Sequence, residues 1–438
     1  MKATVPATRR RDAALGALLF ALWFGAGCGS GAPPPPERIV LIIVDTLRAD
    51  FATCCGRIPA TPNIDALAAR GQRFSNAVGS FHQTTMSMGA LFTGRTPSLE
   101  RAGGEPLKFN SRTWCGMARF ADWDEPGCLP RALRTLPERM QEAGYETLGI
   151  ASNRLLFEPA GFERGFDRWV EVSYRPLARK EGRELEIARV RARSVERVTL
   201  AAMQTLQERR SDRFFLYVHY MDVHDYLVDR DWFENWGQLR GDYASRVERV
   251  DAGIGLLMQA LEKESLLEGS VVVFTADHGE RLGEEHLVEG RSSHWGEPSF
   301  EEVLRVPLIV APPRFEDTER LVRSQDLFHM ICGIAGVPAE ESSALEPSEL
   351  FLGERSWWTY RSGRFKSFAA RDGEAFHLVD LQADPTEVDD VAALHPEVGA
   401  QHRARVAELV DSLGSTRAVP EELTPEDEER LRALGYLD

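Results

Sequence analysis

The sequence predicts an α/β fold with a doubly wound, mostly parallel central sheet and helices on both faces. Continuous apolar, β-branched runs recur along the chain, as at residues 39–44 and 271–275, and such runs are typical of strands buried on both faces of a parallel sheet. Segments with helical apolar spacing separate these runs, so strands and helices alternate. A smaller antiparallel sheet is expected to follow near the C-terminus.

Length and charge set the outer limits of function. The 438 residues are 43% hydrophobic, which suffices for one large domain and a smaller appendage. The 52 basic and 68 acidic residues give a net charge of −16, and there is no long basic run. Nucleic acid is therefore excluded as an expected partner.

The first residues resemble an export leader. Three arginines, Arg9 to Arg11, precede an apolar run that stops at Cys28, and the sequence GAGC is similar to a bacterial lipoprotein cleavage box. We expect residues 1–28 to form a signal peptide or lipoprotein leader and residues 29–37 to form a Pro-rich tether. The protein is then expected in the cell envelope, in contact with the membrane through its lipid and facing the periplasm or exterior. A plain secretory signal with an incidental Cys28 is the alternative.

Elements of the expected domain follow in order. The strand at residues 39–44 ends in Asp45, and a helix is predicted at 62–70, with Thr61 as N-cap and Gly71 as its stop. Residues 145–153 supply a further strand with no acidic residue at its end.

Two later strands also end in polar residues. Residues 214–218 precede His219, Asp222 and His224, and the strand at 271–275 precedes Asp277 and His278. A helix from about 243 to 264 lies between them. Since ligands bind beyond the carboxyl ends of such strands, these carboxylates and imidazoles predict a divalent-metal site. His219 itself is expected to be a satisfied core residue.

Several longer stretches resemble the sulfatase family of the alkaline phosphatase superfamily. They are VDTLRADFATCCGRIPATPNIDALAARGQRFSNAV, LPERMQEAGYETLGIASN, VVVFTADHGERLGEEH and FEEVLRVPLIV, in the usual order. The resemblance implies an alkaline-phosphatase-like catalytic domain at residues 38–356. It also implies a C-terminal subdomain with a closing helix at residues 357–438, where FKSFAAR and AFHLVDL alternate as antiparallel strands do.

Thr84 is the candidate nucleophile that this resemblance identifies. Counting back from Gly94, Thr84 falls where sulfatases carry the cysteine that becomes formylglycine, and Met88 falls on their arginine. Related phosphoesterases, phosphonate hydrolases and phosphoethanolamine transferases use a threonine there, activated by metal coordination. Thr85 is the neighbouring candidate, and a helix-capping threonine is the structural alternative.

The same resemblance implies ligands and substrate contacts. Asp45, Thr84, Asp277 and His278 form the expected metal site. Zn or Mn is favoured and Ca is possible, with one or two ions. A second ion would use the three residues Asp222, His224 and His294.

Other residues have two possible roles. His224 and His294 could instead act catalytically, as donors to the ester oxygens. Arg48 could bind a substrate anion or pair with Asp50, and we favour the salt bridge. The family's sulfate-binding lysine falls near Glu297.

The expected function is therefore metal-dependent hydrolysis, or transfer, of sulfate or phosphate-type esters through a metal-bound threonine. A small-molecule, glycan or lipid ester is the expected substrate, and the oligomeric state is left open. The alternative is a non-catalytic envelope binding protein with a degenerate site. Five cysteines remain besides Cys28, and Cys115 with Cys128 is the pair most easily bridged in an oxidising compartment.

Overall fold

The computed structural model describes residues 33–52, 60–96, 129, 133–157, 160–172, 194–224, 236–288, 296–339, 345–354 and 356–412. The expected leader, the Cys115–Cys128 pair, His294 and the closing helix lie outside these residues. Within them, no helix has both the length and the apolar character needed to cross a bilayer.

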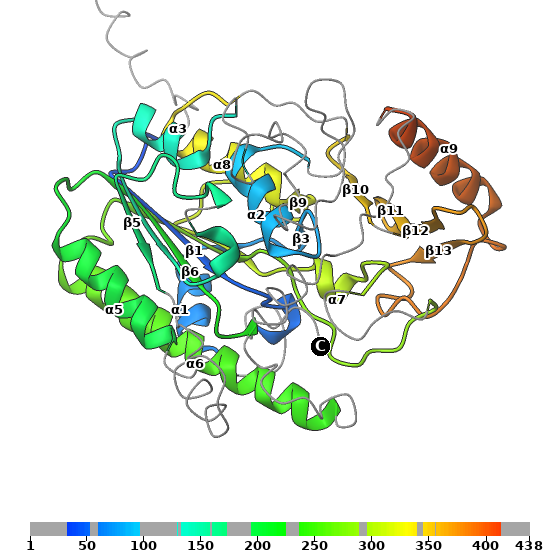
Figure 1. The fold of residues 1–438 in the computed structure, drawn as a ribbon, viewed down its shortest axis with the longest axis horizontal. Coiled ribbons are helices and arrows are strands. Elements are labelled where there is room, and N and C mark those ends of the chain that lie inside the picture. The colour runs from blue at the N-terminus through cyan, green and yellow to red at the C-terminus, as the bar shows by residue number, and fades with distance from the viewer. Residues whose placement is uncertain are drawn as a thin grey trace, which may run out of the picture. The chain divides into compact units, whose positions relative to one another are not determined.

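A seven-stranded sheet forms the centre of the fold, in the order β2-β8-β7-β1-β6-β4-β5 (Figure 1). Strand β1 is parallel to both of its neighbours, β6 and β7, and β4 is parallel to β6 and β5, whereas β8 is antiparallel to β7 and β2 to β8. The predicted mostly parallel sheet is therefore confirmed. Its strands are β1 (Arg38–Val44), β2 (Gln72–Arg73), β4 (Glu146–Ala151), β5 (Arg168–Glu171), β6 (Phe214–Tyr220), β7 (Ser270–Ala276) and β8 (Leu308–Ala311).

The central strand, β1, is buried along its whole length. Every residue of β1 is buried, and residues 39–44 have no exposed surface. Each fully buried aliphatic side chain contributes about 1.5–3 kcal/mol of transfer free energy. This burial fixes the position of the residue that follows the strand, which is Asp45.

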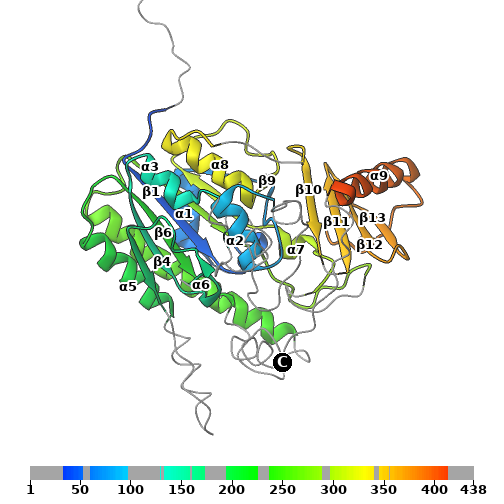
Figure 2. The ribbon, with the colours of Figure 1, turned by 45° about the horizontal axis from the view of Figure 1, so that its top comes forward.

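Helices cover both faces of the sheet, as Figures 1 and 2 show. One layer consists of α1 (Pro62–Arg70), α5 (Ser194–Gln207) and α6 (Trp236–Lys263). The other consists of α2 (Thr84–Thr93), α3 (Leu136–Glu142) and α8 (Ser324–Ala335). Short elements complete the domain: η1 (Ala49–Phe51), η2 (Arg154–Leu156), α7 (Glu301–Leu304), and the two-stranded pair β3 (Ala77–Val78) and β9 (Val322–Arg323).

Helices α1 and α6 are confirmed, with one difference in how α1 begins. Thr61 occupies the N-cap position, but its side chain makes no capping hydrogen bond. Asp251 of α6 accepts hydrogen bonds from the backbone N–H groups of Asn63 (3.1 Å) and Ile64 (2.8 Å) instead. Helix α6 begins earlier than expected, and its predicted apolar face is buried, at Val247, Val250, Ile254, Leu257 and Leu261.

A four-stranded antiparallel sheet follows, as predicted, in the order β10-β11-β12-β13. It begins at Glu349, before the expected boundary at residue 357, because β10 pairs with β11. The elements are β10 (Glu349–Gly353), β11 (Trp357–Ser362), β12 (Phe365–Ala370), β13 (Phe376–Asp380) and the helix α9 (Pro396–Ser412).

Buried charges connect this sheet to the main domain. Lys366 of β12 has no exposed surface, and its Nζ lies 3.2 Å from Glu301 of α7 and 2.8 Å from Glu387. Arg361 of β11 also pairs with Glu301, at 3.2 Å. Buried ions of this kind are tolerated only when they are paired.

Candidate active site

The site lies at the carboxyl edge of the three central strands. Asp45 directly follows β1, and Asp277 directly follows β7. Because Val44 pairs in register with Ala276, the two aspartates leave the sheet side by side. His219 is the second-to-last residue of β6. The last residue, Tyr220, pairs with Val44 on the edge of β1 opposite to β7.

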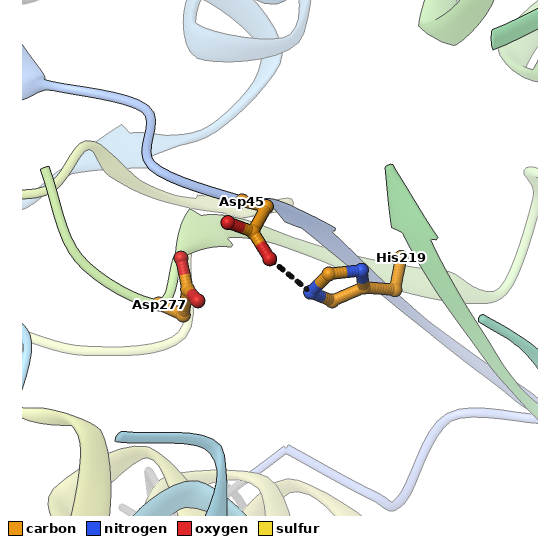
Figure 3. A group of neighbouring side chains, drawn as sticks. All are labelled: Asp45, His219 and Asp277. Carbon is orange, nitrogen blue, oxygen red and sulfur yellow. Dashed lines mark ion pairs between the residues drawn. The ribbon is translucent and has the colours of Figure 1, made fainter. Parts of the chain in front are cut away.

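The three side chains point toward one another (Figure 3). His219 Nε2 lies 3.5 Å from Asp45 Oδ2, and one potential ligand atom from each of Asp45, His219 and Asp277 lies within 4.8 Å of the others. All three are buried, with exposed fractions of 0%, 0% and 1%. His219 was expected to be a satisfied core residue, and that expectation is wrong. Strand β6 continues past Val218 and carries its side chain into the site.

Backbone donors hold the Asp277 carboxylate. Its Oδ1 accepts hydrogen bonds from the N–H groups of Thr46 (3.0 Å) and His278 (2.8 Å). Thr46 has a φ of 57°, a left-handed conformation that costs a non-glycine residue about 1–3 kcal/mol and is concentrated at functional sites. Within the described residues Asp277 Oδ2 makes no hydrogen bond.

His278 has a defined tautomer in this arrangement. Its Nδ1 lies 2.8 Å from the carbonyl oxygen of Gly279, so Nδ1 carries the proton and donates it. In the neutral ring, the lone pair is then on Nε2, which lies 3.5 Å from Asp277 Oδ2 and 3.5 Å from Thr84 Oγ1.

Thr84 lies at the start of α2, as predicted. The N-cap is Gln83 and Thr84 is the first helical residue, so the helix-capping alternative does not describe it. Its Oγ1 lies 3.4 Å from Asp45 Oδ2 as well as 3.5 Å from His278. The hydroxyl, a carboxylate and an imidazole thus share one buried space.

Hydrogen bonds join Asp277, at the end of β7, to the helix that carries Thr84. Ser87 of α2 donates to the carbonyl oxygen of Asp277 at 2.5 Å, and its Oγ lies 2.8 Å from Ser324 Oγ of α8. A Cβ on Gly79 would lie 2.4 Å from the same carbonyl oxygen, so only glycine fits there.

Asn153 is a site residue that sequence reasoning missed. It follows β4, and its Nδ2 donates to Asp45 Oδ2 at 2.7 Å and lies 3.4 Å from Thr84 Oγ1. Its Oδ1 accepts from the N–H of Leu155 at 2.9 Å, which fixes the orientation of the amide. An amide at a strand end has no distinctive sequence signal.

The donor set fits a divalent ion. Two adjacent buried carboxylates repel each other unless a cation lies between them. Burial lowers the pKa of His219 to about 4, although Asp277 opposes this, so the ring is neutral and has a lone pair to offer. Mixed carboxylate and imidazole donors suit Zn or Mn better than Ca.

Residues 37–337 match the family model described as Sulfatase. The chain belongs to the sulfatase family. It is 26% identical over 350 residues to human N-acetylgalactosamine-6-sulfatase, an alignment that covers 72% of this chain and 65% of that relative. The chain therefore spans somewhat less than two thirds of that relative's length.

Solved structures of a sulfatase and of a phosphonate monoester hydrolase have the same fold. A 2-O GAG sulfatase superposes with a TM-score of 0.66 at 18% identity, covering 90% of this chain and 96% of that one. The phosphonate monoester hydrolase of Agrobacterium radiobacter superposes with a TM-score of 0.60 at 16% identity, covering 90% and 99%. At these identities the likeness concerns the fold, which is alkaline-phosphatase-like.

The structure also shows the contacts of two other residues that the resemblance to sulfatases suggested. Arg48 pairs with Asp50 at 2.8 Å and with Glu284 at 2.6 Å, so it forms the favoured salt bridge and its guanidinium is engaged. Burial alone would lower the pKa of Arg48, but hydrogen bonds and the charges of both carboxylates raise it. The arginine therefore stays charged. Glu297 accepts a hydrogen bond from Ser356 N at 2.7 Å, beside the C-terminal sheet.

Asp222 and His224 follow β6 and are buried, but neither belongs to the three-residue cluster among the described residues. Asp222 Oδ2 accepts a hydrogen bond from Ser194 at the start of α5. Their predicted roles, as second-metal ligands or as substrate donors, stay predictions, as does the role of His294.

Proposed function

We propose that this member of the sulfatase family is a metal-dependent hydrolase of sulfate or phosphate-type esters in which Thr84 is the nucleophile. The observation that carries the proposal is the position of Thr84 Oγ1 at a helix start. It lies 3.4 Å from Asp45 and 3.5 Å from His278 in a buried site. A threonine hydroxyl needs such an environment, because it is a weak nucleophile at its ordinary pKa.

Asp45, Asp277 and His278 would hold the ion. When bound, a divalent ion stabilises negative charge on oxygens and lowers the pKa of a hydroxyl beside it. The Thr84 hydroxyl gives up its proton, and Oγ1 forms a bond to the sulfur or phosphorus of the ester. The bond to the alcohol oxygen breaks and the alcohol leaves with a proton. Water then hydrolyses the Thr84 ester, which releases the sulfate, phosphate, phosphate monoester or phosphonate according to the substrate and restores the hydroxyl.

This chain's own residues prepare each step. Asn153 holds Asp45 in place beneath the nucleophile, through the 2.7 Å hydrogen bond. Backbone N–H groups in the first turn of α2 favour an anionic ester group. Either His224 or His294 is the predicted donor of a proton to the leaving alcohol.

The charges of the site favour esters with one negative charge over dianionic phosphate monoesters. Met88 and Glu297 stand where the resemblance places the family's two sulfate-binding cations. Arg48 is engaged by two carboxylates. A phosphate diester, a phosphonate monoester or a sulfate ester carries one negative charge and needs less positive charge than a phosphate monoester, which carries two. A true sulfatase activity is the second candidate, supported by the similarity to human N-acetylgalactosamine-6-sulfatase.

A substrate panel tests the proposal directly. The metal-free protein is loaded with Zn, Mn or Ca and assayed on an aryl sulfate, a phosphate monoester, a phosphate diester and a phosphonate monoester. Added acceptor alcohol tests for transfer. Turnover with Zn or Mn is expected, with Thr84→Ala inactive and Thr84→Ser partly active.

Thr93→Ala is the matched control. It removes a threonine hydroxyl from the other end of the same helix, where Oγ1 donates to Gly89 O at 2.7 Å. Activity of the control close to wild type is expected. Full activity of Thr84→Ala contradicts the nucleophile assignment. A protein that binds metal but turns over no ester favours the alternative of a non-catalytic envelope binding protein.

We also propose that the protein is exported and anchored through a lipid on Cys28, so that it works in the cell envelope. The support is the sequence pattern of residues 1–28. Fractionation of cells that produce Cys28→Ala should show loss of the protein from the membrane fraction. Unchanged membrane attachment rejects the anchor.

A further inference from the structure

His219 combines complete burial with missing hydrogen bonds. Its side chain has no exposed surface. Within the part of the chain that the structure describes, neither ring nitrogen makes a hydrogen bond. Native proteins satisfy almost all buried polar atoms, so an imidazole in this state indicates a partner other than protein.

The surroundings of His219 indicate which partner this is. Its Nε2 faces the carboxylate of Asp45 at 3.5 Å, and Asp277 completes the group within 4.8 Å (Figure 3). The separation of 3.5 Å exceeds the 2.7–3.2 Å usual for an N–H···O hydrogen bond. It suits two ligand atoms on the same ion, which lie farther apart than a donor and its acceptor.

The strand register fixes the position of His219 in the sheet. Position 219 pairs with Ile43 of β1 on one side and with Ala151 of β4 on the other. The backbone of His219 is therefore held between β1 and β4, the strands that lead to Asp45 and Asn153. A core residue in this position has no need of nitrogen atoms, and the aromatic and aliphatic residues elsewhere in β6 show what packing alone selects.

We propose that His219 is a direct ligand of the divalent ion held by Asp45 and Asp277. The proposal deepens the proposed function, since it rests on that function's requirement for an ion. A nitrogen ligand from β6 would make the site prefer Zn, Mn or Co over Ca, which takes oxygen ligands.

Metal binding of the full chain tests this assignment without any turnover. The measurements use the chain with Thr84 intact and no ester present, so that they stay valid whether or not Thr84 is the nucleophile. Zn and Ca dissociation constants are measured by calorimetry, and the visible spectrum is recorded with Co. Loss of a residue that only orients a ligand weakens metal binding by about 10- to 100-fold. His219→Gln should weaken Zn binding by more than that and Ca binding by less, and should change the Co spectrum.

A gain-of-signal variant and a control complete the test. His219→Cys should produce a sulfur-to-Co charge-transfer band, which requires direct contact with the ion. His402→Gln removes another buried imidazole, on α9, and should leave Zn binding unchanged. Thermal unfolding of each metal-free variant shows whether it is folded.

The outcomes separate the two proposals. Folded His219→Gln with wild-type Zn affinity and Co spectrum overturns the ligand role, and so does His219→Cys that binds Co without the new band. If this happens while the wild type still hydrolyses esters, the proposed function stands. If the wild-type protein binds no divalent ion, both proposals fail.

Discussion

At the scale of single residues, Asn153 shows how one amide can control a nucleophile. Its Nδ2 donates to Asp45 Oδ2 at 2.7 Å and also lies 3.4 Å from Thr84 Oγ1. We predict that Asn153→Ala lowers kcat by about 10- to 100-fold, the loss typical when a group that orients a metal ligand is removed. Steady-state kinetics on the best ester of the panel measure this.

A matched amide provides the control for that measurement. Asn63 Nδ2 donates to Asp251 Oδ2, also at 2.7 Å, but between α1 and α6. Asn63→Ala should lower the free energy of unfolding by about 1–3 kcal/mol, as the loss of a buried partner does. Its kcat should be unchanged. Equal losses of kcat in the two variants contradict a specific role for Asn153.

His402 predicts a pH dependence of stability. Its Nδ1 lies 3.0 Å from Ser367 Oγ, and burial lowers its pKa from 6.5 to about 4, although the charge of Glu349 opposes this. Between these values the unfolded chain binds a proton that the folded chain does not, so stability falls as pH falls from 6.5 toward 4. Above pH 6.5 the group contributes no pH dependence.

Urea unfolding of His402→Gln at several pH values tests this. Between pH 6.5 and 4.5 the variant should lose less stability than the wild type. Above pH 6.5 the free energies of unfolding of the two proteins should differ by a constant amount. His395→Gln replaces another imidazole, next to α9, and serves as the control. Parallel curves for wild type and His402→Gln contradict the assignment.

At the scale of elements, the start of α1 depends on a distant helix. Asp251 of α6 accepts from two backbone N–H groups of the first turn, whereas the Thr61 side chain makes no capping bond. Asp251→Ala should therefore lower the free energy of unfolding by about 1–2 kcal/mol, the upper range for a lost cap. Thr61→Ala should cost less. Chemical denaturation of both variants measures this difference. If Thr61→Ala is the less stable variant, Asp251 is not the residue that caps α1.

The pattern of apolar residues predicted which strands and helices form more accurately than it predicted where they end. The apolar runs predicted β1 and β7, and with them the positions of Asp45 and Asp277. Strand β6 was expected to end at Val218 because a histidine interrupts the apolar run. Burial against two neighbouring strands outweighs that local signal. It is why His219 was missed as a site residue.

Partners that are distant in sequence explain the other omissions. Asn153 and Asp251 are common residue types whose roles depend on groups at least 100 positions away, at separations of 108 and 187 residues. No pattern within one element contains that information. Strand β10 was not predicted, because only its pairing with β11 shows that it belongs to the C-terminal sheet.

At the scale of the whole molecule, Lys366 couples the C-terminal sheet to the main domain. Lys366→Met leaves Glu301 and Glu387 without the buried ammonium that lies 3.2 and 2.8 Å away. Breaking a buried pair in this way costs about 3–5 kcal/mol. We therefore predict a large fall in the melting temperature, measured by calorimetry.

A second substitution shows that charge is responsible. Lys366→Met combined with Glu387→Gln removes the carboxylate that the single variant leaves unpaired with Lys366, since Glu301 keeps its pair with Arg361, and should recover part of the loss. Lys263→Met, on the exposed end of α6, should change the melting temperature little. If the double variant is as unstable as the single one, lost packing rather than lost pairing explains the effect.

The two halves of the site are synthesised at different times, because they lie far apart in the sequence. The hydrogen bond from Thr46 N to Asp277 Oδ1 joins positions 231 residues apart. At about 5–20 residues per second, synthesis of the intervening chain takes about 10–50 s. During that interval β1, which is apolar along its whole length, has no β7 to pair with, and an unpaired apolar strand is prone to aggregate. We therefore expect the edge of β1 that pairs with β7 to need cover until residue 276 has emerged, even after β6 has paired with the other edge.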